Sequence, residues 1–244
     1  MRWRVNDGVH WHTGERGGAI LNLGTGRWYW LNPTAAALWE LLTDPDSDDP
    51  AAISTAPGPL AGVPAMKVGA DLADLAEQLL AMGVLSAAPA GAKVPRTPRI
   101  PAQPVPASGR TECSEVASTA PERGAPAALW AAAAMLHILP TSTVVRLAHG
   151  LRHRAGGHRT VDTGQASAAL TAVRRACAWY PGRAACLETS LAAALLCWAH
   201  RLPVTWNLGV RFDPHECHAW IAVDGQPVGE PAERDRALHP VLTV

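Results

Sequence analysis

Short runs of aromatic and branched residues, separated by glycine, open the chain. Ala19–Leu23 and Arg27–Leu31 flank the turn Gly24-Thr25-Gly26, a pattern typical of a β-hairpin. Trp3–Val5 and Val9–Trp11 have the same character, and we expect them to lie in or beside one further strand. The first 31 residues therefore predict three short strands.

A helical period follows these strands. Asn32 suits an N-cap and Pro33 the first helical position. The apolar face of this helix is Ala35, Leu38, Trp39 and Leu42. A second helix is predicted from about Asp71 to Met82, where Gly83 ends it, with Leu72, Leu75, Leu79 and Met82 on one stripe. Between the two helices, Asp44–Gly62 reads as a loop with a short helix near Ala51–Thr55.

Prolines recur through residues 87–126 among alanine, serine and glycine, at a density that sustains neither a helix nor a sheet. We interpret this stretch as a Pro/Ala-rich linker. It divides the chain into a first domain at residues 1–86 and a second at 127–244.

The second domain begins with helical patterns and ends with strand patterns. The predicted helices are Leu129–Leu139, Thr141–Arg154, Thr163–Tyr180 and Cys186–His200. The predicted strands are Val204–Phe212 and Cys217–Val223, with a return strand Gln226–Glu230 after the turn Asp224-Gly225. The whole chain is therefore predicted to be α+β: strands then helices in the first domain, helices then an antiparallel sheet in the second.

Charge and cysteine content narrow the function classes. The net charge is zero and no nucleic-acid motif is present, so neither nucleic acid nor a membrane surface is an expected partner. The apolar runs are too short or too rich in alanine to span a bilayer, and the N-terminus lacks the apolar run of a secretory signal. Five irregularly spaced cysteines without a CxxC pair argue against disulfides and zinc. We expect a cytoplasmic protein.

Cys186 is the first candidate catalytic residue. Alone, it would be a small buried residue, but it falls in the first turn of a predicted helix. Unpaired N–H groups and the helix dipole lower a thiol pKa there and can hold an oxyanion. His218 lies on the strand that follows, and an acid lies on the return strand. A cysteine at a helix start facing a strand histidine is the arrangement of papain-like and transglutaminase-like enzymes.

A metal site is the weaker interpretation of the same region. His215, Cys217 and His218 are close in sequence, but on one strand these positions do not all face the same way. We therefore expect no metal and no cofactor.

The first domain resembles the PQQ-synthesis D-like family of precursor-recognition elements, which are small winged-helix-like domains. The residues that carry the resemblance are GGAILNLGTGRWYWLNPTAAALWELL and DLADLAEQLLAMGVL. The resemblance implies that a leader peptide adds as a strand beside the third strand and the last helix. The implied contact residues are Arg27, Trp28, Tyr29, Trp30, Leu72, Leu75 and Leu79. The alternative is that Arg27–Leu31 is only a core hairpin.

The second domain resembles the lasso-peptide leader peptidase, a branch of the transglutaminase-like cysteine proteases. The residues that carry this resemblance are GRAACLETSLAAALL, LPVTWNLGVR and HAWIAVDGQPVGE. It implies Cys186 as nucleophile, His218 as base, and Glu230 in place of the family's aspartate. A three-residue loop would put Glu230 on the face of His218, and a two-residue loop on the other face. Asp224 is the fallback orienter.

A fused chain of this kind would bind the leader of a ribosomally made precursor and cleave it from the core. An asparagine-synthetase-like cyclase would then close the ring. Two other functions stay open from the sequence: a transglutaminase-type acyl transfer to an amine, and a non-catalytic chaperone that presents the precursor.

Overall fold

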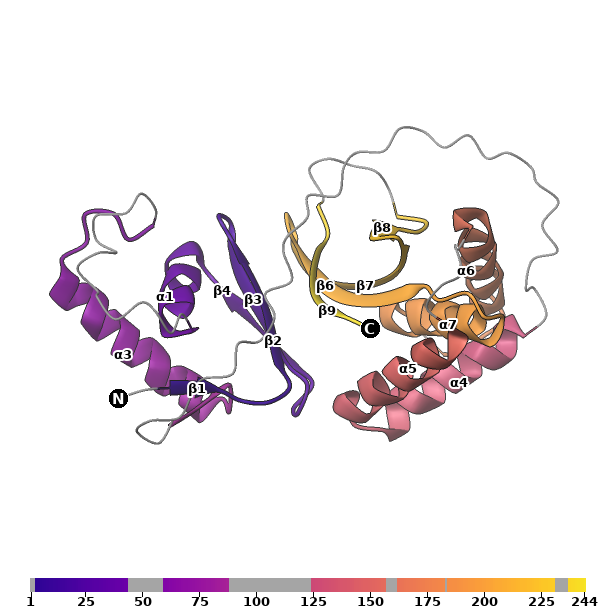
Figure 1. Cartoon of the computed structure of the whole chain (residues 1–244), viewed down its shortest axis with the longest axis horizontal. Helices are drawn as coiled ribbons and strands as arrows, with labels where there is room; N and C mark the ends of the chain where they lie inside the picture. Colours follow the sequence, from indigo (N-terminus) through magenta and orange to yellow (C-terminus); the bar gives the residue numbers. More distant parts are fainter. Residues whose placement is uncertain (1–2, 44–58, 88–123, 157–161, 183, 231–236) are drawn as a thin grey trace. The chain divides into compact units, whose positions relative to one another are not determined.

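The computed structural model describes residues 3–43, 59–87, 124–156, 162–182, 184–230 and 237–244. The chain divides into two compact units, Met1–Pro101 and Ala102–Val244 (Figure 1). The first unit has strands followed by helices, and the second has helices followed by an antiparallel sheet. The predicted α+β class with two domains is thus confirmed. Most of the predicted linker, and the short helix near Ala51–Thr55, lie outside the described residues.

The first unit holds a three-stranded antiparallel sheet and a separate two-stranded ribbon. The sheet has the order β2 (Val9–Gly14), β3 (Gly17–Asn22), β4 (Arg27–Leu31). β1 (Trp3–Val5) does not join it, but pairs with β5 (Leu85–Ala87). Val9–Trp11 lies in the first strand of the sheet, as expected, but Trp3–Val5, which we expected in or beside that strand, belongs to the separate ribbon. The amide of Asn6 donates to the carbonyls of Gly83 and Leu85, which ties this segment to the β5 end of the unit.

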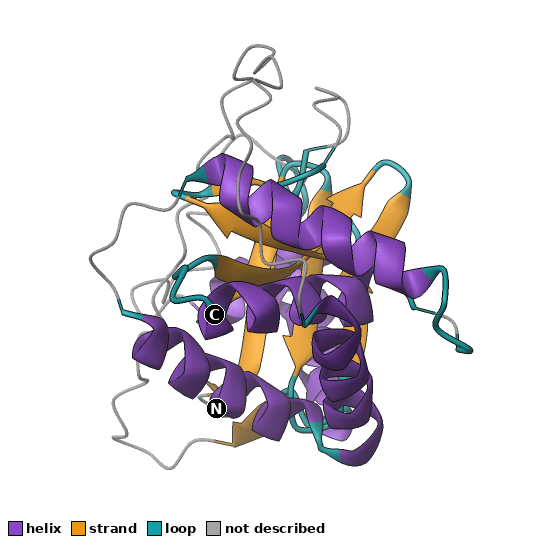
Figure 2. Cartoon of the chain, turned by 90° about the vertical axis from the view of Figure 1, so that its right-hand side faces the viewer, coloured by secondary structure: helices purple, strands orange, loops and turns teal. Residues whose placement is uncertain are grey.

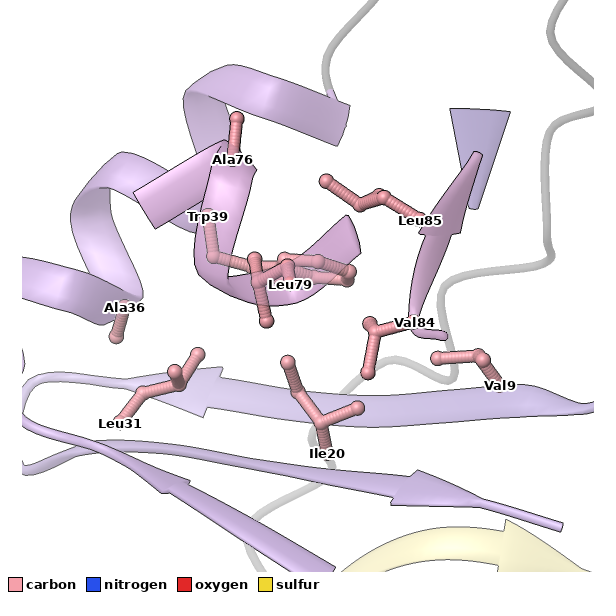
Figure 3. Packing of buried hydrophobic residues seen from close by; sticks show 9 residues of the cluster. All are labelled: Val9, Ile20, Leu31, Ala36, Trp39, Ala76, Leu79, Val84 and Leu85. Carbon is pink, nitrogen blue, oxygen red and sulfur yellow. The ribbon is translucent and has the colours of Figure 1, made fainter. Parts of the chain in front are cut away.

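The described part of the first unit also holds two helices, α1 (Pro33–Thr43) and α3 (Ala65–Ala81). Asn32 caps α1 as predicted, since its Oδ1 accepts from the N–H of Ala35 at 2.8 Å. α3 begins six residues before the expected Asp71, and it is followed by Gly83 at φ +67°. Figure 3 shows the core between these helices and the sheet. Its members are Val9, Ile20, Leu31, Ala36, Trp39, Ala76, Leu79, Val84 and Leu85.

Helix α7 lies at the centre of the second unit (Figure 1). It spans Cys186–Ala199 and contacts strands β6 and β7 as well as the three other described helices of this unit. Those helices are α4 (Ala125–Ile138), α5 (Thr141–Ala155) and α6 (Thr163–Cys177). Alanine at positions 192–194 lets its neighbours pack closely, and these three residues are fully buried. α4 begins four residues before the expected Leu129, after Gly124 at φ +110°. Figure 2 shows the chain turned by 90°, with helices and strands in different colours.

The sheet of the second unit has four strands in the order β8-β7-β6-β9. They span β6 (Thr205–Phe212), β7 (His215–Val223), β8 (Gln226–Pro227) and β9 (His239–Thr243). β9 pairs antiparallel with β6 and was not predicted. The return strand was expected to reach Glu230, but its pairing as a strand ends at Pro227.

Two indole hydrogen bonds fix α7 against the sheet. Trp206 Nε1 on β6 donates to Ser190 Oγ on α7 at 3.0 Å, and both side chains are buried. Trp198 Nε1 donates to the carbonyl of Val204 just before β6, also at 3.0 Å. Buried indole N–H groups need such partners, so these bonds hold α7 against β6 and the segment before it.

None of the described helices combines the length and the apolar character needed to cross a bilayer.

Candidate active site

Cys186 is the first residue of α7, as predicted. The N–H groups of the first helical turn have no partner within the helix, which favours a negative charge at this end. Glu188 stabilises the turn by accepting from the N–H of Ala185 at 3.0 Å. This is half of a capping box, because an alanine has no side-chain acceptor for the reciprocal bond.

The surroundings of Cys186 favour the ionised form of its thiol. A hydrogen bond with the His218 side chain has the largest effect and lowers the thiol pKa. Burial acts in the opposite direction, while hydrogen bonds with the backbone of Ala219 and Leu187 lower the pKa further. The net shift is downward, so the sulfur is anionic over a wider pH range than an ordinary cysteine.

His218 lies in the middle of β7, directly opposite Gly209 on β6. Its contact with the Cys186 thiol, and then its contact with Glu230, raise its pKa to about 9 in spite of burial. The raised histidine pKa and the lowered thiol pKa describe one coupled pair, a thiolate beside an imidazolium. The structure thus brings Cys186 and His218 together as the sequence predicted.

Glu230 is the third member of the group. His218 Nε2 lies 3.0 Å from Glu230 Oε2, and both side chains are largely buried. The ring N–H is not aligned on that oxygen, so the contact is an ion pair rather than a linear hydrogen bond. Nε2 is thereby turned to the carboxylate, which leaves Nδ1 available to the thiol.

Glu230 reaches His218 by a route that the strand register did not predict. The loop after β7 has two residues, since Val223 pairs with Gln226 and Ala222 with Pro227. A continued strand would place Glu230 on the face away from His218. Instead the strand ends and Gly229 adopts φ +68°, which breaks the alternation and turns the carboxylate back. Our expectation that a two-residue loop would put Glu230 on the other face from His218 was wrong.

Two arginines surround the Glu230 carboxylate. Arg211 Nη2 on β6 donates to Oε2 at 2.8 Å, and Arg174 on α6 donates to the neighbouring carbonyl of Gly229 at 3.2 Å. Burial raises the pKa of Glu230, but His218 and then the charges of Arg211 and Arg174 outweigh it, so the pKa is lowered. Glu230 therefore stays ionised at neutral pH.

Asp224 lies away from His218, so the expectation that it could orient His218 in place of Glu230 is corrected. It is exposed at the tip of the β7–β8 hairpin, where φ +48° suits the first turn position before Gly225. It lies six positions after His218 along the strand, roughly 20 Å at the usual rise per residue. It faces a different pocket, of about 670 Å³, with His149, Arg152 and His153 among its lining residues.

A pocket of about 290 Å³ opens onto the three grouped residues. Cys186, His218 and Glu230 line it with apolar side chains from α6, β7 and the segment after β8. Those side chains are Leu170, Ile221 and Val228. Cys177 is half-buried and lines the pocket too, with its sulfur 3.8 Å from Thr189 Oγ1. A thiolate, an imidazolium and a cavity beside them can support nucleophilic attack on a carbonyl.

The alternative metal residues do not converge. His215 is exposed at the start of β7 and faces the Phe212 ring, whereas Cys217 is half-buried. Within the described ranges, no three His, Cys, Asp or Glu side chains are placed to hold a metal ion.

The residues expected to contact a leader peptide occupy two positions in the first unit. Arg27–Leu31 form β4, at one end of the three-stranded sheet. Tyr29 packs on the core while Trp28 and Trp30 point to the other face. Leu72 and Leu75 on α3 are half-buried, but Leu79 is only 2% exposed within the core. Leu79 was therefore wrongly included, because a helix stripe includes the residues that hold the helix to its own domain.

Arg211 is the site residue that sequence reasoning missed. It lies in the predicted strand Val204–Phe212 as one cation among apolar neighbours. A buried arginine almost always has an anionic partner, and Glu230 was already a candidate acid. An arginine in an apolar strand together with a candidate acid was therefore the sequence signal from which this ion pair could have been predicted.

Comparison with known families gave two matches, one in each unit. Residues 17–85 match the family model for coenzyme PQQ synthesis protein D (PqqD). Residues 128–243 match the model for the transglutaminase-like superfamily. Comparisons with curated proteins and with solved structures gave no match.

Proposed function

Because the chain joins a PqqD-like domain to a domain of the transglutaminase-like superfamily, we propose that it is a leader peptidase. Its substrate would be a ribosomally synthesised lasso-peptide precursor, which it binds by the leader and cuts between leader and core. The observation that carries this proposal is the grouping of Cys186, His218 and Glu230 around one pocket at a helix start.

The first half of the reaction uses the charge pair. The Cys186 thiolate attacks the carbonyl carbon of the last leader residue, and the carbonyl oxygen becomes an oxyanion. The N–H groups at the start of α7, which have no partner within the helix, would stabilise it. His218 gives its proton to the nitrogen of the first core residue. The C–N bond breaks, the core leaves with a free amine, and the leader remains as a thioester on Cys186.

The second half consumes water. Neutral His218 takes a proton from a water molecule, and the resulting hydroxide attacks the thioester carbonyl. The C–S bond breaks, the leader leaves as a carboxylic acid, and the thiolate–imidazolium pair is restored. Glu230 keeps the imidazole oriented and balances its charge when it is protonated.

Leader binding is assigned to β4. Among the described strands, β4 pairs only with β3, so its other side is an edge to which an extended peptide can hydrogen-bond. Arg27, Trp28, Tyr29 and Trp30 would supply the side-chain contacts, together with Leu72 and Leu75 of α3. Holding the leader on the same chain raises the effective concentration of the cleavage site near Cys186.

The proposed place of action is the cytoplasm, with the freed amine passed to an asparagine-synthetase-like cyclase. Such a cyclase would join that amine to an acidic side chain of the core. The core peptide with its free N-terminal amine would therefore be the substrate of the cyclase.

Incubation of the full chain with a lasso precursor, followed by mass spectrometry, tests the proposal. The wild type should release leader and core with the mass of one added water, and Cys186→Ala should release neither. Cys197→Ala is the matched control, since Cys197 lies on the same helix in the core and burial raises its pKa to about 12.

Three results would overturn the proposal in different ways. A leader joined to an amine instead of water would indicate acyl transfer. Unchanged processing by Cys186→Ala would indicate a presenting chaperone. An intact precursor with both wild type and control would exclude this substrate class.

A further inference from the structure

We propose that Arg211 is a positioning residue of this site: its buried guanidinium holds the Glu230 carboxylate against His218 and supplies the positive charge that balances the ionised group. The inference rests on the proposed function for its activity test, although the charge balance itself can be measured without a substrate.

The position of Arg211 follows from the sheet. Arg211 lies directly opposite Glu216 and two residues beyond Gly209, which lies opposite His218. Residues two apart on a strand share a face, so Arg211 and His218 are diagonal neighbours on one face of the sheet. From there Arg211 Nη2 and His218 Nε2 approach the same oxygen, Oε2 of Glu230, at 2.8 and 3.0 Å.

Burial makes this contact more than a surface ion pair. The side chains of Arg211, His218 and Glu230 are 10, 14 and 12% exposed. A carboxylate at that depth loses hydration and needs charge partners to stay ionised. An exposed pair would contribute little, but breaking a buried one leaves an uncompensated charge.

The charged groups of the site sum to zero when all six are counted. In the reactive state Cys186 and Glu230 are negative, and so is Glu216, which is half exposed and lies near Arg211. His218 and Arg211 are positive, and so is Arg174, which donates to the backbone of Gly229. Removal of Arg211 would leave a net negative charge at the site, which opposes formation of the thiolate.

The geometry suits arginine better than lysine. One guanidinium nitrogen reaches Glu230 at 2.8 Å, and the other lies 3.7 Å from Glu216 across the strand pair. A forked donor can face two carboxylates at once, whereas an ammonium supplies charge at a single point. Arg211→Lys should therefore keep part of the effect.

The test compares Arg211→Met, Arg211→Lys and the control Arg154→Met, which removes an exposed arginine from α5. For each variant, kcat and KM for precursor cleavage are measured across pH, together with the rate of Cys186 alkylation by iodoacetamide. Arg211→Met should lower kcat by about tenfold or more with little change in KM. It should also move the acidic limb of both profiles up by about one pH unit. For Arg211→Lys, kcat and the position of the acidic limb should lie between those of the wild type and Arg211→Met. Arg154→Met should match the wild type in both.

A double mutant separates positioning from folding. If Arg211 acts through Glu230, adding Arg211→Met to Glu230→Gln should lower kcat little further than Glu230→Gln alone. Additive losses, or an unmoved acidic limb in Arg211→Met, would overturn the proposal. If Arg211→Met does not fold, an unmoved limb in Arg211→Lys would overturn it equally. If the wild type cuts no precursor, the proposed function fails, while the alkylation profiles still decide the role of Arg211.

Discussion

Gly209 lies directly opposite His218, and the absence of a side chain there leaves room for the Trp220 ring. A Cβ at position 209 would meet the carbonyl oxygen of His239 and would lie 2.6 Å from Cη2 of Trp220. The Trp220 ring is nearly parallel to the His218 imidazole, at an angle of 13° with centroids 6.1 Å apart. One glycine thus lets β9 approach β6 and lets an indole flank the imidazole.

Gly209→Ala should therefore damage both stability and the site. Because the backbone of β9 must move, we expect a loss of about 1–3 kcal/mol in the free energy of unfolding, measured by urea denaturation. Cleavage should fall as well, because Trp220 must shift against His218. Gly150→Ala is the control: it adds the same methyl on α5, where nothing lies within 4 Å, and should be neutral or stabilising. Equal stability of the two variants would contradict the close approach.

Glu230→Gln should slow cleavage strongly, by about 100-fold or more, because an amide cannot balance the imidazolium charge. Asp224→Asn removes a carboxylate from the same hairpin and should leave the rate unchanged, since Asp224 is exposed at the turn. Steady-state kinetics on the full chain measures both. Full activity in Glu230→Gln with loss in Asp224→Asn would move the orienting role to the turn.

The pH dependence of kcat/KM should be bell-shaped. The thiolate forms as pH rises through the lowered pKa of Cys186, which sets the acidic limb below the ordinary range of a thiol. The imidazolium loses its proton as pH rises further, which sets the basic limb near the His218 pKa of about 9. The limbs belong to the coupled pair rather than to either residue alone.

Alkylation at about pH 7 gives an independent check of the same charges. Burial raises the pKa of Cys217 to about 11, with further contributions from the charges of Cys186 and Glu216. Iodoacetamide should accordingly label Cys186 before Cys217 and Cys197, as read by mass spectrometry of the digested protein. Faster labelling of Cys217 would show that the thiolate lies there.

Leader binding should depend on the aromatic residues of β4. Trp30→Ala, in a Cys186→Ala background that prevents cleavage, should weaken binding of a labelled leader peptide by about tenfold, measured by fluorescence anisotropy. Trp30 is 38% exposed and lies on the edge strand, so the change should not remove core packing. Met66→Ala, at a residue 89% exposed at the start of α3, is the control. Equal affinity of the two variants would place the leader elsewhere.

Periodicity and turn chemistry predicted most of the fold. The start of α7 at Cys186 and the tight turn at Asp224-Gly225 could be read from local signals, because a helix start and a two-residue hairpin have distinct residue requirements. The extent of α4 and α3 could not, because Ala-rich and mixed sequence before the first leucine gives no boundary signal. β9 was missed because a five-residue strand holding His239 and Pro240 has little strand character of its own.

The same contrast holds for the site. Cys186 and His218 could be predicted, since each position has a chemical reason that local sequence shows. The approach of Glu230 could not be derived from register, because a left-handed Gly229 cancels the alternation that the argument assumed. The pairing of Arg211 with Glu230 joins residues 19 apart on two elements, a tertiary contact that no local pattern encodes.

The ionisable groups of the site come from five separate places in the chain: α6, α7, β6, β7 and the segment after β8. They leave the ribosome in the order Arg174, Cys186, Arg211, His218, Glu230, after the whole first unit. The first unit can therefore fold while the sulfur is still an ordinary thiol. A growing chain would therefore carry the half to which we assign leader binding before the half to which we assign cleavage. The charged groups around Cys186 would be complete only once residue 230 had been synthesised and folded into place.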